Sequence, residues 1–99
     1  KTPVVLNVRE ILYAETQNHT VLLHLKNECL TVSESMKSLE GKTQGFPFFR
    51  CHSSFLVNLE AVDQIGRTEV IVAGTPIPIS KHRRTEFLQA MTNYIGGSH

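Results

Sequence analysis

The chain has 99 residues, with 10 Lys and Arg against 9 Asp and Glu, and a formal net charge of +1. This length fits one domain, and a hydrophobic content of 40% argues against intrinsic disorder. The sequence contains no run of about 18 apolar residues and no pattern of a secretory signal, so a transmembrane helix and membrane contact are not expected. Two cysteines, Cys29 and Cys51, are too few for a disulfide scaffold. We therefore expect a cytoplasmic protein without a metal or a cofactor.

The first third of the chain has the pattern of β-strands. An apolar run covers residues 4–8, and residues 11–15 predict a strand that leads into a turn at Gln17-Asn18-His19. Apolar residues then alternate with more polar ones over 21–26, the period of a half-buried strand. A tight turn into a strand over 29–32 would complete a hairpin, in which we expect Cys29 to pack as a small apolar residue.

The middle of the chain changes period and then returns to strands. Ser33 predicts the start of a helix that buries Met36 and Leu39 and stops at Gly41. An apolar stretch over 48–57 follows, interrupted by polar residues, and residues 58–60 predict a turn or one helical turn. Short strands are expected next, over 62–65, 69–73 and 76–79.

The last predicted element is a C-terminal helix from about Lys81 to Tyr94. Ser80 would be its cap, and the glycines at 96–97 would end it. Its predicted apolar stripe consists of Phe87, Leu88, Met91 and Ile95. The fold class is therefore mostly β with a short helix and a C-terminal helix, and we assign 1–95 to one domain and 96–99 to a tail.

The distribution of charge is more informative than its sum. A pI near 8.0 is below the value of about 9 expected of many DNA-binding domains. Acidic residues are nevertheless missing from three windows, 16–27, 42–59 and 70–85, which hold six of the ten Lys and Arg and four of the five His. If the fold gathers these windows on one side, a basic face results.

The first turn of the last helix carries cations where the helix dipole disfavours them. Lys81, His82, Arg83 and Arg84 each cost a few tenths of a kcal/mol there, up to about 1 kcal/mol. A bound phosphate would relieve this cost, because the helix N-terminus offers free N–H donors. The alternatives are a solvated basic turn and a contact from Arg83 to Glu86.

The segment Arg50–Ser54 places Arg, His and Ser side chains between apolar residues. These side chains contact phosphates and base edges in many proteins, although an ordinary polar strand end is the alternative. Cys51 and His52 suggest a nucleophile, but neighbours on a strand point to opposite faces, and no nucleophile elbow or Gly-rich phosphate loop is present. We therefore expect no enzyme, and keep a hydrolase built on Cys51 and His52 only as a second alternative. If exposed, Cys51 would be the thiol with the lower pKa.

Three segments together resemble the LytTR DNA-binding domain of bacterial response regulators. They are Glu10–Glu15, Phe48–Asn58 and Pro76–Lys81, and the central one resembles the family pattern F-x-R-x-H-x-S-F-x-V-N. The resemblance implies elongated antiparallel β-sheets with a small helix, and DNA contacts from loops and strand ends that reach successive major grooves. It also implies that a first strand usual in the family is short or missing here.

The resemblance also implies which residues lie at the DNA. By position they are Gln17, Asn18, His19, Arg50, His52, Ser53, Lys81, Arg83 and Arg84. They fall in the three windows without acidic residues. Lys81 stands where an arginine is common, which favours a phosphate contact over bidentate base recognition.

The function expected from this resemblance is sequence-specific binding of double-stranded DNA by a domain of a bacterial transcriptional regulator in a two-component system. It would bind repeat sites in promoters as a homodimer on DNA, with a receiver or sensor domain outside this chain. The first alternative is a protein-interaction module of the same fold without specific DNA binding, which would capture its partner through the C-terminal helix.

Overall fold

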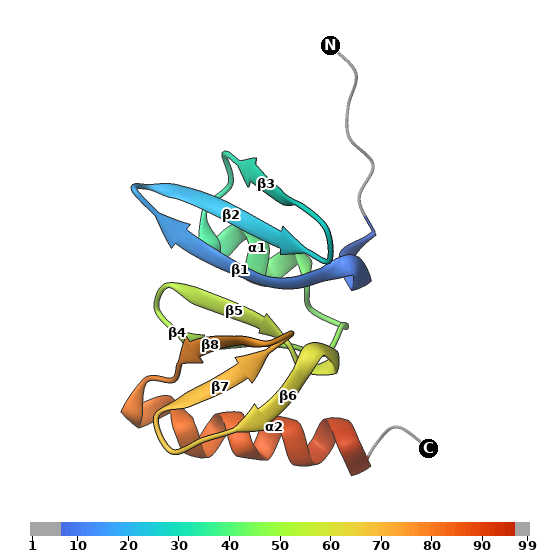
Figure 1. Ribbon diagram of the computed structural model, residues 1–99, viewed down its shortest axis with the longest axis vertical. Coiled ribbons are helices and arrows are strands. Elements are labelled where there is room, and N and C mark those ends of the chain that lie inside the picture. Colours follow the sequence, from blue (N-terminus) through green and yellow to red (C-terminus); the bar gives the residue numbers. More distant parts are fainter. Residues whose placement is uncertain (1–6, 97–99) are drawn as a thin grey trace.

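The computed structural model describes residues 7–96 and consists of two antiparallel sheets and two helices (Figure 1). The larger sheet has the order β3-β2-β1-β5-β4, with β1 Ile11–Gln17, β2 Thr20–Leu25, β3 Cys29–Val32, β4 Phe48–His52 and β5 Phe55–Asn58. The smaller sheet has the order β6-β7-β8, with β6 Val62–Ile65, β7 Glu69–Val72 and β8 Thr75–Pro78. The helices are α1 Met36–Lys42 and α2 Arg84–Gly96. The predicted mostly β class is confirmed.

Single 3-10 turns connect several of these elements. They cover Val8–Glu10, Leu59–Ala61 and Lys81–Arg83. Most of the apolar run at 4–8 lies outside the described residues, and Val8 begins the first of these turns. The short helical turn expected after Asn58 is the second of them.

The helix predicted from Ser33 begins two residues later. The Ser35 hydroxyl accepts a hydrogen bond from the Ser38 N–H at 3.0 Å, which makes Ser35 the N-cap. The helix also continues through Gly41 to Lys42, so Gly41 is not its stop. Both apolar residues of the predicted face, Met36 and Leu39, are buried. The periodicity predicted the buried face correctly, but it did not determine which of two serines is the cap.

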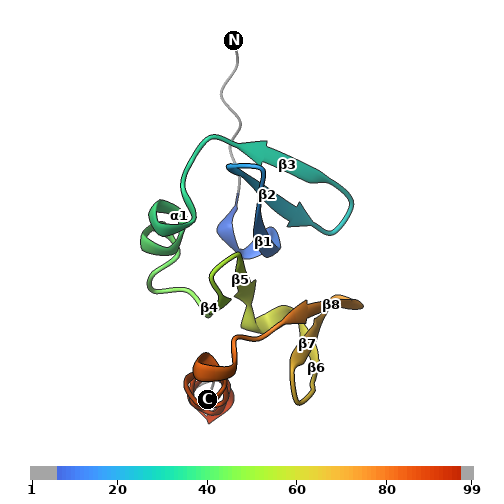
Figure 2. The same cartoon turned by 90° about the vertical axis from the view of Figure 1, so that its left-hand side faces the viewer.

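The five-stranded sheet has a separate apolar core on each face, and β5 contributes to both. Leu56 packs with α1 in a core that contains Ile11, Ala14, Val21, Leu23, Met36 and Leu39. Its neighbour Val57 points to the other face, into a core with the smaller sheet and α2 that includes Val70, Val72, Ile77, Phe87 and Met91. Figure 2 shows the two halves, with the larger sheet and α1 at one end of the molecule and the smaller sheet and α2 at the other.

Asn58 joins the two halves at the end of β5. It is buried, its Nδ2 donates to the Ile11 carbonyl at 2.9 Å, and its Oδ1 accepts the Glu60 N–H at 2.9 Å. One side chain thus fixes the start of β1 and caps the turn that leads to the smaller sheet. Because both polar groups are satisfied, its burial is stabilising rather than costly.

The C-terminal helix differs in detail from the prediction. The α-helix begins at Arg84, after the 3-10 turn, and the Ser80 side chain makes no capping hydrogen bond. Phe87 and Met91 are buried as predicted, whereas Ile95 is 64% exposed. Ala90 and Tyr94, which are partly buried, pack against the core together with Phe87 and Met91. Within the described residues, no helix is long and apolar enough to cross a membrane.

Candidate nucleic-acid interface

Hydrogen bonds bring the three predicted segments to one side of the molecule. The Thr16 N–H at the end of β1 donates to the Ser54 carbonyl at 2.9 Å, which joins the β1–β2 turn to the β4–β5 turn. The Ser80 N–H donates to the Cys51 carbonyl at 2.8 Å, which joins the segment after β8 to β4. The three segments follow one another along the long axis, on the left in Figure 1 and facing the viewer in Figure 2. We call this side the polar row.

The β1–β2 turn presents three predicted site residues to solvent. Gln17 ends β1, and Asn18 and His19 form the two-residue turn with φ of 51° and 65°. Two successive residues in the left-handed region are characteristic of a type I′ hairpin turn. All three are exposed, and the His19 ring has no partner among the described residues. The turn therefore presents an imidazole on a rigid hairpin.

The β4–β5 turn presents His52 and Ser53. The His52 Nδ1 accepts the Ser54 N–H at 3.1 Å, so the neutral ring carries its proton on Nε2. Nε2 is then a hydrogen-bond donor, suited to a phosphate oxygen or an acceptor on a guanine edge. Ser53 is exposed at the tip of the turn.

Arg50 is held by contacts within the protein. Its Nη2 donates to the Ser53 carbonyl at 2.7 Å, and its Nη1 pairs with Glu40 Oε1 at 3.3 Å. These contacts shape the β4–β5 turn and bring a carboxylate of α1 next to the polar row. Among the described residues, Arg50 Nε is the buried side-chain polar atom without a hydrogen-bond partner.

Both arginines at the start of the last helix are also engaged. Arg83 donates from Nε to the Arg50 carbonyl at 3.1 Å, and its guanidinium carbon lies 4.8 Å from the centre of the Phe49 ring. The expected alternative contact is present as well, since Arg83 Nη1 lies 3.2 Å from Glu86 Oε1. Arg84 donates to the carbonyls of Arg67 and Gly66 at 2.8 and 3.1 Å. These two arginines thus hold the last helix against both sheets.

Lys81 is placed differently from the two arginines. It is exposed, and no ion pair or hydrogen bond engages it within residues 7–96. Of the four cations predicted as site residues, only Lys81 therefore has a charge free to meet a phosphate without breaking an existing contact.

The structure adds residues to the site that the sequence reasoning did not assign. A shallow depression between the β1–β2 and β4–β5 turns is lined by His19, Ser53 and Lys37 of α1. A second, of about 330 Å³, is bordered by Ser53, Ser80 and His82. His82 and Ser80 belong to the basic run in the sequence and could have been found there. Lys37 gave no such signal, because it lies in a stretch between acidic residues.

The basic face is narrower than the sequence windows predicted. Lys26 lies in the β2–β3 turn, at the opposite end of β2 from His19. Lys42 pairs with Glu34, and the His24 Nε2 lies 2.6 Å from Glu15 Oε1. Neither Lys42 nor His24 extends the polar row, since each contacts an acid from outside its window.

The two cysteines differ in exposure, and Cys29 is not packed as predicted. Cys51 is fully buried, burial raises the pKa of its thiol to about 11, and its Sγ donates to the Pro78 carbonyl at 3.5 Å. The lower pKa considered for this thiol depended on its exposure, and Cys51 is not exposed. Cys29 is exposed rather than packed, because it begins the edge strand β3. His52 is bonded to the turn backbone, so no thiol–imidazole pair forms.

Comparisons with known proteins agree with this architecture. The LytTR family, described as the LytTr DNA-binding domain, matches residues 1–92. The chain is 32% identical over 87 residues to the sensory transduction protein LytT of Oceanobacillus iheyensis, covering 79% of this chain and 35% of that protein. It is 26% identical over 95 residues to the transcriptional regulatory protein YpdB of Escherichia coli, covering 89% of this chain and 39% of that protein. The chain thus spans little more than a third of the curated relatives it matches.

A solved structure shows the same fold. A LytTr DNA-binding domain from Bacillus cereus superposes with a TM-score of 0.74 at 20% identity, covering 83% of this chain and 81% of that one. The order of the three motif segments, the two antiparallel sheets and the family match over residues 1–92 lead to one assignment. The chain belongs to the LytTR family of DNA-binding domains found in bacterial response regulators.

Proposed function

We propose that this chain binds specific double-stranded DNA sites through the polar row, as the effector domain of a bacterial transcriptional regulator. The observation that carries the proposal is the set of hydrogen bonds from Thr16 to Ser54, from Ser80 to Cys51 and from Arg83 to Arg50. They hold three exposed polar segments in fixed order along one side. Sequence-specific DNA-binding proteins need this kind of preorganisation, because base contacts require hydrogen-bond donors and acceptors at fixed positions.

The dimensions of the molecule support the proposal. Its longest extent is 42 Å, longer than one turn of B-DNA, about 34 Å. Because the row follows this axis, we propose that its turns reach successive major grooves on one face of the duplex. We place the β1–β2 and β4–β5 turns at the base edges, and Lys81, at the far end of the row, at the phosphates.

We assign the residues of the polar row different roles according to the chemistry of their side chains. His19, His52 and Ser53 are neutral donors or acceptors at the tips of rigid turns, and we assign them to base edges and adjacent phosphates. Lys81 and Lys37 are exposed cations without ion pairs in the described residues, and we assign them to phosphates. Arg50, Arg83 and Arg84 act as positioning residues that hold the turns. Gln17 and Asn18 frame the His19 contact.

The larger assembly follows from the length of the relatives. Because they are more than twice as long as this chain, we propose that a receiver or sensor domain outside residues 1–95 supplies the input signal. Two copies of the domain are then brought to repeated half-sites as a homodimer on DNA. Signal-dependent pairing would increase affinity through effective concentration without any new contact to DNA.

The interaction-module alternative has less support in the structure. It requires a free apolar stripe on the C-terminal helix, but Phe87 and Met91 are buried in the core. The polar row, in contrast, is exposed at both of its outer turns.

The test is selection of binding sites from random duplexes at about 150 mM salt, followed by fluorescence anisotropy on the selected site. Specific binding predicts enrichment of one motif, and His19→Ala and Ser53→Ala should each change the preferred bases. Lys26→Ala serves as the control, because it removes a charge at the opposite end of β2. No enrichment, with only weak salt-sensitive binding by every protein, would overturn the proposal.

A further inference from the structure

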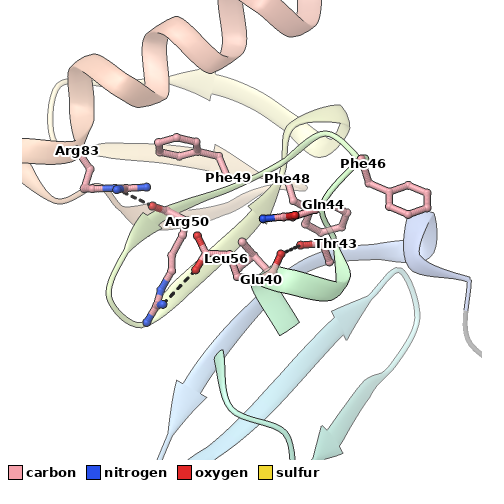
Figure 3. Close-up of a pocket in the computed structure, with 10 residues that line it drawn as sticks. Glu40, Thr43, Gln44, Phe46, Phe48, Phe49, Arg50, Leu56 and Arg83 are labelled. Carbon is pink, nitrogen blue, oxygen red and sulfur yellow. Dashed lines mark hydrogen bonds and ion pairs between the residues drawn. The ribbon is translucent and has the colours of Figure 1, made fainter. Parts of the chain in front are cut away.

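A third depression lies behind the β4–β5 turn and differs from the polar row in chemistry. It has a volume of about 480 Å³ and opens between the end of α1, the loop before β4, and Arg83. Figure 3 shows its lining, in which Phe46, Phe48 and Phe49 supply aromatic surface and Leu56 an aliphatic side chain. Phe46 is 41% exposed, which is high for so large an apolar side chain. The volume is within the range of small-molecule sites, about 300–1,000 Å³.

Charged groups gather at one end of this depression. Arg83, Arg50 and Glu40 all line it, and in Figure 3 they lie together, away from Phe46. The Arg50–Glu40 contact is long, at 3.3 Å, and it uses Nη1 alone, while the buried Nε of Arg50 has no partner in the described part of the chain. Because Nη2 already donates to the Ser53 carbonyl at 2.7 Å, a ligand carboxylate that replaced Glu40 would bind at Nη1.

We propose that this depression is a binding site for a small planar aromatic anion. The ring would lie against the phenylalanine side chains, where offset or edge contacts are favourable. The carboxylate would exchange with Glu40 at the Arg50 guanidinium. A neutral ligand of the same shape gains only the first of these contacts, and an aliphatic anion only the second, so the site selects for both features together.

Occupation of this site by the anion should weaken DNA binding. This effect rests on the proposed function, whereas the binding of the ligand is independent of it. Arg50 lines both this depression and the one bordered by Ser53, Ser80 and His82 on the polar row. A ligand carboxylate at Arg50, with Glu40 released beside it, adds negative charge next to the DNA phosphates. By linkage, DNA must weaken the ligand by the same factor.

The direct test is an NMR titration of the isotope-labelled chain with 2-naphthoate, without DNA. We expect a dissociation constant below about 1 mM, with amide shifts concentrated at residues 44–50. Naphthalene-2-carboxamide, the neutral isostere, should bind at least about fivefold more weakly, because it lacks the charge-assisted bond to Arg50. Shifts confined to other parts of the chain, or equal affinity for both compounds, would overturn the proposal.

A pair of charge variants separates ligand recognition from a change in the fold. Glu40→Gln removes the competitor for Arg50 and should tighten 2-naphthoate severalfold while leaving the carboxamide unchanged. Glu60→Gln removes the same charge from a different ion pair, with Arg9 at 3.4 Å, and should change neither. Phe46→Ala should weaken both compounds, since it removes exposed ring surface. Equal effects of Glu40→Gln and Glu60→Gln would contradict a site at Arg50.

The effect on DNA is measured last, by anisotropy on the selected duplex with and without saturating 2-naphthoate. We expect a severalfold increase in the dissociation constant for DNA, and none with the carboxamide. Ligand binding without any DNA binding would refute the proposed function alone. DNA binding without ligand binding would refute the ligand site alone, and binding of both without coupling would refute the shared role of Arg50.

Discussion

The β1–β2 turn offers a direct way to separate stability from DNA recognition. His19 occupies the left-handed region at φ 65°, a conformation that glycine adopts without steric cost. His19→Gly should therefore stabilise the fold while it removes the side chain that we place at the DNA. A residue that lowers stability but supplies the contact is expected at a functional position.

The magnitude follows from two opposing terms. The left-handed conformation costs an L-residue about 1–2 kcal/mol, and less for His, which is enriched there. Relief of this cost by glycine is offset by about 0.4–1 kcal/mol, because glycine gives the unfolded chain more conformational entropy. The net increase in the free energy of unfolding is about 0.5 kcal/mol, or about 2–4 °C in Tm for a domain of this size. Loss of a base contact costs about 1–3 kcal/mol, a 5- to 150-fold weaker complex.

The β7–β8 turn supplies a matched control. Ala73 has φ 50° and precedes Gly74 at φ 85°, so this turn has the same backbone form as the one that holds His19. It lies at the opposite side of the molecule from the polar row (Figure 1). Ala73→Gly should stabilise by about 1 kcal/mol, more than His19→Gly because Ala is less suited to this region, and should leave DNA binding unchanged.

Urea unfolding followed by circular dichroism gives the two stabilities, and anisotropy on the selected duplex gives the two affinities. A destabilised His19→Gly would refute the account of the turn. Unchanged DNA affinity in that variant would show that His19 is not a base contact. An equal loss of affinity in Ala73→Gly would show that turn flexibility, and not the imidazole, controls binding.

Three further predictions address charge, thiols and the core. Lys81→Ala should reduce the slope of log K for DNA binding against log salt concentration by about 0.9, whereas Lys26→Ala should leave this slope unchanged. Fluorescence anisotropy between about 50 and 200 mM salt measures both slopes. In alkylation with iodoacetamide followed by mass spectrometry, Cys29 should react far faster than Cys51, whose pKa burial raises to about 11, and Cys51 should become reactive only on unfolding or at high pH. Asn58→Ala should lower the free energy of unfolding by about 2–4 kcal/mol in urea titrations, because it leaves buried backbone groups unpaired.

Local pattern predicted much of the β structure. The alternation over 21–26 and the turn residues around it depend only on neighbours, so the hairpin of β1 and β2 was predictable to within two residues. The same holds for β6, β7 and β8. Errors occurred where two local solutions have similar energy, as with Ser33 and Ser35 as caps of α1, and where tertiary contacts select the buried face, as at Ile95.

The positions of the candidate site follow from the family resemblance and remain a prediction, whereas the state of its charges needed the structure. That Gln17-Asn18-His19 forms a turn could be predicted because turn chemistry is local. Whether Arg50 is free or paired depends on α1, which brings Glu40 to within 3.3 Å across 10 positions of chain. In the folded protein, acidic residues from other parts of the chain therefore contact the sequence windows that contain none.

The sequence by itself determined the fold class, the family and the order of the exposed turns, because these depend on periodicity, on turn residues and on the motif Phe48–Asn58. Only the tertiary structure decided that the turns form one row, that Arg83 and Arg84 hold the last helix, and that Cys51 is buried. The physical reason is that burial and ion pairing depend on distances between residues far apart in the chain, and these are set by how two sheets and two helices pack.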